Sequence, residues 1–222
     1  MASTWAVTRE RGSAAGFHSR PVPETPDRSV SVLEVERPAL VLGSTQPESD
    51  ADAGALAAAG VELARRRSGG GAVLLRPEEV LWVDVVVPRR DSLWDDDVGV
   101  AFHWLGRSWA AALADLGVRA VVHEGPLVTT RWSRLVCFAG LGPGEVTVEG
   151  AKVVGIAQRR TRGGARFQCA LLARWEPSGI TSFLALDEGE RARAEEDLAG
   201  AAAAVDVPWD AAVDALVARL PG

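Results

Sequence analysis

The stretch VEGAKVVGIAQRR at residues 148–160 reads as the end of a β-hairpin that spans residues 145–160, and it holds the only lysine of the chain, Lys152. All other cationic side chains among the 24 Lys and Arg residues are arginines. Small residues flank the lysine, and a glycine within a strand, such as Gly155, often marks the close approach of a ligand or of another backbone. Lysine carries a compact, strongly hydrated charge that arginine does not reproduce. We therefore expect Lys152 to place an ammonium against a phosphate or an oxyanion, and the alternative is chance survival of one surface lysine.

A second informative stretch, LARRRSGGGAVL, lies upstream at residues 63–74. Its three consecutive glycines, residues 69–71, remove side chains from the loop, so that backbone N–H groups can close on a ligand and form an anion nest. The arginines before the glycines add a fork-shaped positive charge that suits phosphate or carboxylate. The alternative is a flexible hairpin turn with a solvated basic edge. Against this, the apolar segments that follow the loop are expected to anchor it.

Apolar periodicity divides the remainder of the chain into strands and helices. The predicted strands are residues 29–36, 39–42, 73–75, 81–87, 119–123, 145–148, 151–160 and 166–175. The predicted helices are residues 47–59, 95–116, 188–204 and 209–220. Residues 1–28 contain several prolines and are expected to be a loosely ordered arm with a short helix near residues 13–17. Asp84 lies within a predicted strand, and we interpret it as solvent-facing in preference to pointing into a ligand cleft.

Composition excludes several classes of protein. The chain has 222 residues, 47% of them hydrophobic, which suits one domain with an ample core. The net charge of −6 argues against the basic surface that a nucleic-acid-binding protein needs. No apolar run is long enough for a membrane span, and the N-terminus has no signal-peptide core. Two cysteines in apolar surroundings, Cys137 and Cys169, indicate a reduced cytoplasmic setting, and no metal-ligand cluster is visible.

Three segments together resemble the lipoate–protein ligase A family within the biotin/lipoate ligase and octanoyltransferase group. Residues 63–74 resemble its Arg-Arg-x-Ser-Gly-Gly-Gly-Ala-Val signature, residues 40–46 its strand ending in Gly-x-x-Gln, and residues 150–159 its Gly-x-Lys motif ending in Ala-Gln-Arg. The resemblance implies an α+β biotin/lipoate-ligase-like (BPL/LPL) catalytic domain over residues 29–222. Its sheet would be mixed and largely antiparallel, with helices packed on it and no C-terminal accessory domain.

The same resemblance implies the site. Lys152 would be catalytic, and Cys137, in a Cys-Phe pair similar to that of cysteine octanoyltransferases, would be a second catalytic candidate. A small buried cysteine is the structural alternative for Cys137. The expected nucleotide- and acyl-binding residues are Arg66, Ser68, Gly69, Gly70, Gly71, Ala72, Val73, Leu74, Gly155, Ala157 and Gln158.

The implied function is a lipoate– or octanoate–protein ligase. It would use ATP and Mg²⁺ as co-substrates and acylate a lysine of a lipoyl carrier domain of the 2-oxoacid dehydrogenase E2 or glycine cleavage H protein type, with acyl carrier protein as a further candidate partner. An ATP-independent octanoyltransferase with Cys137 as nucleophile, and a non-catalytic ligand-binding or partner protein, are the alternatives. The chain departs from the family at Leu75 and Cys169, where the family has histidines.

Overall fold

Two β-sheets form the centre of the molecule, for which a computed structural model describes residues 5–222. The large sheet is seven-stranded and contains, in spatial order, β1 (Ala6–Gly12), β2 (Ser29–Val35), β6 (Val80–Pro88), β10 (Gly164–Leu172), β9 (Ala151–Arg160), β8 (Val146–Val148) and β7 (Val121–Val122). The small sheet has the order β4 (Glu62–Arg65), β3 (Ala39–Leu42) and β5 (Val73–Leu75). Among the strands that the structure describes, only the pairs β1–β2 and β3–β4 are parallel, which confirms a mixed, largely antiparallel architecture.

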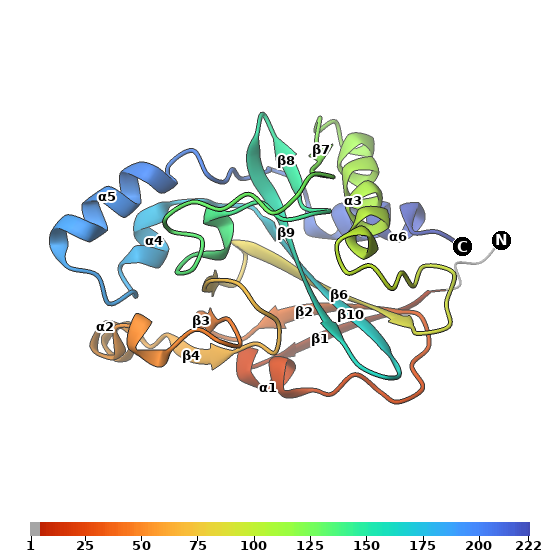
Figure 1. Ribbon diagram of the computed structural model, residues 1–222, viewed down its shortest axis with the longest axis horizontal. Helices are drawn as coiled ribbons and strands as arrows, with labels where there is room; N and C mark the ends of the chain where they lie inside the picture. The colour runs from red at the N-terminus through yellow and green to blue at the C-terminus, as the bar shows by residue number, and fades with distance from the viewer. Residues whose placement is uncertain (1–4) are drawn as a thin grey trace.

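Most of the helices cover the outer faces of the two sheets (Figure 1), and the first helix packs between the sheets. They are α1 (Ala14–Ser19), α2 (Ala53–Ala59), α3 (His103–Asp115), α4 (Pro177–Thr181), α5 (Glu188–Leu198) and α6 (Trp209–Arg219), with short 3₁₀ turns η1 (Glu48–Asp50), η2 (Val100–Phe102) and η3 (Cys137–Ala139). The arrangement confirms an α+β fold. No helix within residues 5–222 combines the length and the apolar character that crossing a bilayer requires.

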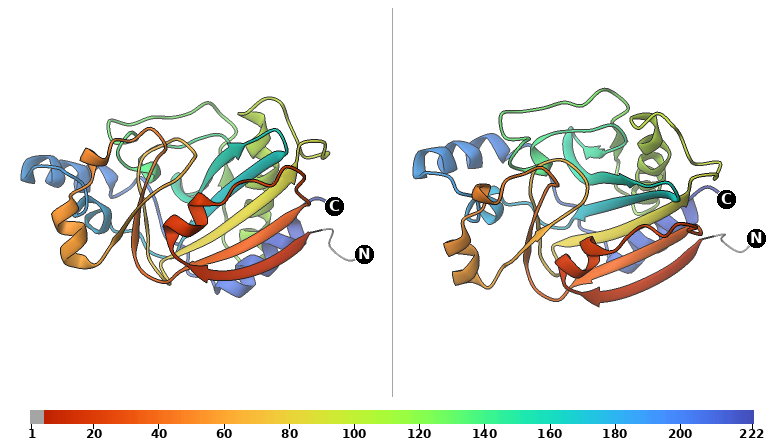
Figure 2. Two further views of the ribbon diagram at one scale, coloured as in Figure 1. Left: turned by 90° about the horizontal axis from the view of Figure 1, so that it is seen from below. Right: turned by 60° about the horizontal axis from the view of Figure 1, so that its bottom comes forward.

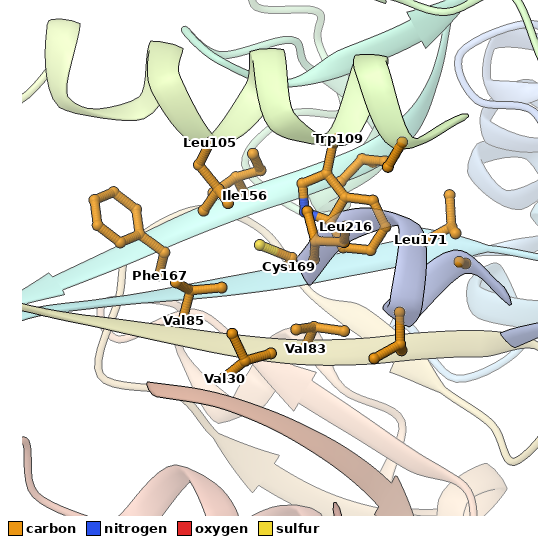
Figure 3. Packing of buried hydrophobic residues seen from close by; sticks show 14 of the residues in the cluster. Val30, Val83, Val85, Leu105, Trp109, Ile156, Phe167, Cys169, Leu171 and Leu216 are labelled. Carbon is orange, nitrogen blue, oxygen red and sulfur yellow. The ribbon is translucent and has the colours of Figure 1, made fainter. Parts of the chain in front are cut away.

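The main core lies between the large sheet and the pair α3 and α6. Trp109 of α3 and Leu216 of α6 are fully buried against residues of β6 and β10 such as Val83 and Phe167 (Figure 3). These side chains belong to alternate positions of their strands, so the other positions of β6 and β10 face the opposite side of the sheet. That opposite side faces the small sheet and carries the cavity described below.

The small sheet is buried on both of its faces. In β3 the side chains of Ala39 and Val41 pack toward the large sheet, whereas Leu40 and Leu42 pack with α2, α4 and α5. All four residues are buried, which explains why β3 is a short continuous apolar run without alternation. The molecule is therefore layered: the two sheets face each other, α1 packs between them, and the other helices lie outside.

The expectation of a loose N-terminal arm is wrong for residues 6–12, which form a strand, whereas the short helix expected near residues 13–17 is confirmed. Strand β1 pairs in parallel with β2 from Ala6 opposite Ser29 to Gly12 opposite Val35, and it forms the outer edge of the large sheet (Figure 2). Helix α1 follows, with the Ser13 side chain accepting the N–H of Gly16 as an N-cap. The prolines that suggested a loose arm all follow both elements, within residues 20–28. Residues 1–4 lie outside the described residues.

Several element boundaries also differ from those predicted. The helix expected over residues 95–116 begins only at His103, because Asp95 and Asp97 accept N–H groups of their own loop instead of capping a helix. The helix expected over residues 47–59 is divided into η1 and α2, and Asp52 caps α2. Helix α5 ends at Leu198, six residues earlier than predicted. The hairpin at residues 145–160 is confirmed as β8 and β9.

Candidate functional site

Two connected cavities of different size lie on the side of β9 that faces the small sheet. The wider one, here called the cleft, has a volume of about 710 Å³. The narrower one, here called the pocket, has a volume of about 50 Å³ and lies between the two sheets. Cys137, Ile156 and Ala157 line both, so the pocket opens into the cleft at these residues.

The glycine loop at residues 69–71 lines the cleft and is held from both sides. A Cβ atom on Gly43 would lie 1.8 Å from the carbonyl oxygen of Gly70, and one on Gly71 would lie 2.5 Å from the backbone nitrogen of Val136. Both glycines are therefore required for close backbone approach. Among the described residues, no hydrogen bond uses the N–H groups of residues 69–71, although the next N–H, of Ala72, donates to Leu135.

The Arg66 side chain holds this loop in place through hydrogen bonds to its carbonyl oxygens. The side chain is 4% exposed, and its Nη2 donates to the carbonyl oxygens of Gly71 at 2.7 Å and Gly69 at 2.9 Å. Its Nη1 donates to the carbonyl of Val41 at 3.4 Å. Because the loop carbonyls bind the guanidinium, Arg66 acts in this structure on the loop itself, and the unpaired N–H groups of the loop are left for a ligand.

Two further polar atoms at the cleft have no partner. Ser68 Oγ and Gln158 Nε2 are buried and make no hydrogen bond to any described residue, and both residues line the cleft. Buried polar atoms in folded proteins nearly always have a partner. The unpaired Ser68 and Gln158 atoms, together with the free N–H groups of residues 69–71, indicate a ligand that accepts and donates hydrogen bonds here.

Lys152 lies at the bottom of the cleft with its ammonium fully occupied. Its Nζ donates to the carbonyl oxygens of Cys137 and Gly140, both at 2.8 Å, and to Glu145 Oε2 at 2.9 Å. The Nζ also lies 4.8 Å from the ring centre of Phe138. An ammonium has three N–H donors, so all of them are used. Three acceptors gathered round one compact point suit lysine and not the planar arginine fork, which accounts for a lysine at this position.

Glu145 completes this arrangement from the start of the hairpin. The carboxylate is buried, and it accepts the N–H of Ile156 at 3.1 Å and that of Gly142 at 2.6 Å besides the ammonium. The Lys152–Glu145 ion pair is therefore neutral as a unit. It ties β9 to residues 137–142, the segment that includes η3.

The two cysteines have different environments. Cys137 is half-buried in η3, its N–H donates to Ala72, and its Sγ lies 3.8 Å from the position of a Cβ on Gly70, so the thiol faces the glycine loop. Cys169 lies within the main core, where burial raises the pKa of its thiol to about 12. Only Cys137 is placed where a cysteine could act on a ligand, since Cys169 is fully buried.

The pocket is apolar for most of its length. Gly155 and Ala157 of β9 form its floor together with Ala170 of β10, and Val41 and Leu75 of the small sheet lie among the residues opposite. A Cβ on Gly155 would lie 3.2 Å from Phe138 Cζ, so this glycine keeps the floor open. At position 75, where the resemblance implies a histidine, Leu75 instead contributes to the apolar lining of the pocket.

A histidine enters the pocket from another element. His18 of α1 is 7% exposed and stacks on Trp82 with ring centres 4.5 Å apart, and its Nδ1 lies 3.3 Å from Gln168 Nε2. Burial, reinforced by the positive charges of Arg66 and Arg166, lowers the pKa of His18 to about 3. The imidazole is therefore neutral at pH 7.

Asp84 contacts two residues of the pocket lining and is not solvent-facing as expected. The carboxylate is 5% exposed, and it accepts from Trp82 Nε1 at 2.7 Å and from Gln168 Nε2 at 3.5 Å. Arg166 Nε lies 3.6 Å away. Burial raises the pKa of Asp84 to about 6, although the charge of Arg166 opposes this shift. The solvent-facing expectation fails because α1 and residues 20–28 cover this part of the sheet.

Most of the residues singled out from the sequence gather at the two cavities. The cleft is lined by Ser68, Gly69, Gly70, Gly71, Cys137, Lys152, Ala157 and Gln158, and the pocket additionally by Arg66, Val73 and Gly155. Two do not take part. Ala72 is buried and bridges to Val136, and Leu74 faces a separate groove beside α4.

Five contributors were missed from the sequence: His18, Trp82, Phe138, Glu145 and Gln168. Only Glu145 had a usable signal, since a charged residue at the start of a hairpin strand can reach a lysine on the paired strand. Among residues 5–222 no group of three or more His, Cys, Asp or Glu side chains could hold a metal ion.

The fold and these cavities define an α+β domain with a ligand-binding cleft, and comparison with known proteins identifies the family. The family model of the lipoyl protein ligase A/B catalytic domain matches residues 19–205, so the chain belongs to that family. No curated protein sequence matches the chain.

Several solved structures share the fold. A bipartite lipoate protein ligase from Thermoplasma acidophilum, described together with its E2 lipoyl domain, is 19% identical, with a TM-score of 0.74 over 98% of this chain and 82% of that one. A lipoate-protein ligase A bound with ATP is 20% identical, with a TM-score of 0.71 over 99% of this chain and 84% of that one. A Plasmodium falciparum protein in complex with lipoate is 11% identical, with a TM-score of 0.63 over 97% of this chain and 61% of that one.

Proposed function

We propose that this chain is an ATP-dependent lipoate– or octanoate–protein ligase. The observation that carries the proposal is the set of unpaired hydrogen-bonding groups at the cleft, next to an apolar pocket. Free N–H groups of residues 69–71 and the orphaned Ser68 Oγ suit the oxygens of a nucleotide phosphate. The pocket that opens beside them suits an aliphatic acyl chain. A ligase needs these two sites side by side.

The chemistry proceeds in two steps. In the first, a carboxylate oxygen of the acid attacks the α-phosphorus of ATP, the bond to pyrophosphate breaks, and an acyl-adenylate forms. In the second, the neutral amine of an acceptor lysine attacks the acyl carbon, AMP leaves, and the amine loses its proton to water. The glycine-loop N–H groups hold the phosphate in a fixed position in both steps, which is how preorganised donors lower such barriers.

Lys152 contributes through the turn that it holds and through its charge. Its three donors bind Cys137, Gly140 and Glu145, so the ammonium reaches an anionic ligand by exchanging one of these acceptors for a ligand oxygen. Exchange of the Cys137 or Gly140 carbonyl oxygen for an oxygen of the α-phosphate or of the substrate carboxylate leaves Glu145 paired with the ammonium. Mg²⁺ would arrive with ATP, and the described residues offer no cluster of their own for it.

The acceptor in this proposal is a lipoyl carrier domain of the E2 or H-protein type. Support comes from the archaeal relative, which is described with its E2 lipoyl domain. Arg65, part of the basic stretch before the glycines, donates to the carbonyls of Gly43 and Gln46. Arg134, in contrast, lines the cleft and is the better candidate for contact with an acidic acceptor.

The test is intact-mass spectrometry of a lipoyl domain incubated with the full chain, lipoate or octanoate, and ATP. The expected result is addition of one acyl group to the acceptor, only when ATP is present. Gln158→Leu removes an orphaned donor of the cleft and should lower the rate about tenfold or more. Absence of acylation with every acid and acceptor, under conditions where the chain is folded, would support the non-catalytic alternative.

One observation favours a second route. Cys137 lines both the cleft and the pocket, so its thiol lies where the carbonyl of a pocket-bound acyl chain would emerge. In this route the thiolate attacks an octanoyl thioester, the donor thiol leaves, and the acceptor amine then attacks the acyl-cysteine and frees the thiolate. A stable octanoyl adduct formed without ATP, present in the wild type and absent from Cys137→Ala, would replace the ligase proposal with this one.

A further inference from the structure

The direction of the pocket follows from the register of its floor. Gly155 of β9 is paired with Ala170 of β10, and Ala170 is paired with Trp82 of β6. The β9 end is shared with the cleft, so the Trp82 end is the far end. Adjacent strands lie about 4.8 Å apart, so the floor extends roughly 10 Å from β9 to β6.

His18 lies at this far end and is held there by several contacts. The imidazole stacks on Trp82, Gln168 lies within hydrogen-bonding distance, and the neighbouring Phe17 packs edge-on against the same indole at 5.6 Å. Helix α1, which carries both, is capped by Ser13 and joined to β4 through Glu62, whose Oε1 accepts the N–H of Ala15. These contacts make the end of the pocket a packed surface.

The chemistry of this surface suits the end of an alkyl chain. A neutral imidazole stacked on an indole offers an apolar face, whereas a charged imidazolium buried beside hydrocarbon would be costly. The neighbouring lining residues Leu75, Val73 and Ala170 are apolar as well. The pocket therefore selects by length and shape, and ends at the ring pair of His18 and Trp82.

We propose that His18, supported by Trp82, is the end wall of the acyl pocket and sets the length of the acyl chain that the pocket accepts. An extended chain advances about 3.5 Å over three bonds. Roughly eight bonds therefore fill a floor of about 10 Å. This inference rests on the proposed function, because it assigns the pocket to the acyl group.

The test measures chain-length preference with four forms of the full chain: wild type, His18→Ala, His18→Trp and Ser19→Ala. Ser19 is the matched control, since it is exposed on the same helix. Isothermal titration calorimetry gives the affinity for free unbranched acids of six to fourteen carbons without turnover. An equimolar mixture of the same acids, with ATP and a lipoyl domain, gives the ratio of acylated products. Ratios within one variant cancel any loss of folded protein.

In wild type and Ser19→Ala, affinity should fall about tenfold when two methylenes are added to the preferred acid. His18→Ala should move the optimum two to four carbons longer, with about a tenfold gain for the longer acid relative to the shorter one, because each additional methylene can then be buried. His18→Trp should move the optimum to shorter acids. A shift in opposite directions for the two substitutions is not produced by a general loss of stability.

Unchanged chain-length profiles in both His18 variants overturn the end-wall proposal, even if acylation proceeds. If His18→Ala is insoluble, His18→Trp alone decides the matter. A shifted binding profile together with no acylation by any donor leaves the end wall supported and sinks the proposed function. A wild type that binds none of the acids overturns both.

Discussion

The pocket and the cleft are adjacent, but they differ in size and in the chemical groups that line them. The pocket is narrow and walled by apolar side chains, with the neutral His18 at its end. The cleft is more than ten times larger and presents unpaired backbone N–H groups and the orphaned Ser68 and Gln158 atoms. The buried cations beside them, Arg66 and Lys152, both bind backbone carbonyls. In this protein the buried cations hold loops in place, and unpaired backbone N–H groups remain available to a ligand.

Removing Lys152 should have the largest effect, both on the free energy of unfolding and on the rate of acylation. Lys152→Met leaves the Glu145 carboxylate buried without its partner, and we expect a loss of about 3–5 kcal/mol in the free energy of unfolding. Acylation should fall by more than 100-fold, because the turn that carries Cys137 loses its anchor. Urea unfolding and the mass-spectrometric acylation assay measure the two quantities.

A double variant separates the structural and chemical contributions of Lys152. Lys152→Met combined with Glu145→Gln removes both charges and should regain much of the lost stability without regaining activity. Recovery of both would show that Lys152 acts only by holding the turn.

The next largest effect is expected at the glycine loop. Gly43→Ala would place a methyl group 1.8 Å from the Gly70 carbonyl oxygen, a backbone atom that can move only if the loop shifts. We expect a cost of about 1–3 kcal/mol and loss of measurable ATP binding, detected by thermal unfolding and calorimetry. Gly200→Ala, which meets nothing within 4 Å, is the control and should leave both unchanged. Intact ATP binding in Gly43→Ala would show that the glycine loop does not hold the nucleotide.

A substitution on the pocket floor should affect only one of the two cavities. Gly155→Leu fills the space beside Phe138 and should weaken octanoate binding about tenfold or more, since the buried apolar area is lost. ATP binding should stay within about threefold of wild type. Calorimetric titrations with each ligand separately measure this difference. Equal loss of both ligands would mean that the cavities are not independent.

The smallest effect concerns pH and the end of the pocket. The lowered pKa of His18 means that the folded state favours the neutral imidazole, so its stabilising contribution is complete above pH 6.5 and is lost as the pH falls toward 3. Between pH 7.5 and 5 the loss should be about 2 kcal/mol. Asp84, whose pKa is raised, acts in the opposite direction in this range.

Comparison of wild type with His18→Gln isolates the histidine, because Asp84 remains in both. Urea unfolding at pH 7.5, 6 and 5 should show a shallower loss of stability in the variant. Identical slopes would show that His18 titrates normally, and hence that it is not buried in the pocket.

Much of the fold could be predicted because its signals are local. Alternating apolar residues mark β2 and β6, and the hairpin turn at Glu149 and Gly150 has positive φ at both positions. The N-terminal strand β1 was missed because its residues are mostly exposed and do not alternate, so only the pairing with β2 identifies it. The start of α3 was missed because aspartates stabilise loops as readily as helix ends.

The sequence by itself determined the family, the glycine loop and the hairpin with its single lysine, because each is written in consecutive residues whose spacing follows the geometry of strands and turns. Only the tertiary structure decided what the buried charges bind. It joins Lys152 to the carbonyls of Cys137 and Gly140, outside its own hairpin, and it brings His18 within 3.3 Å of Gln168, 150 positions away. Such contacts depend on how the sheets stack, and no local pattern encodes them.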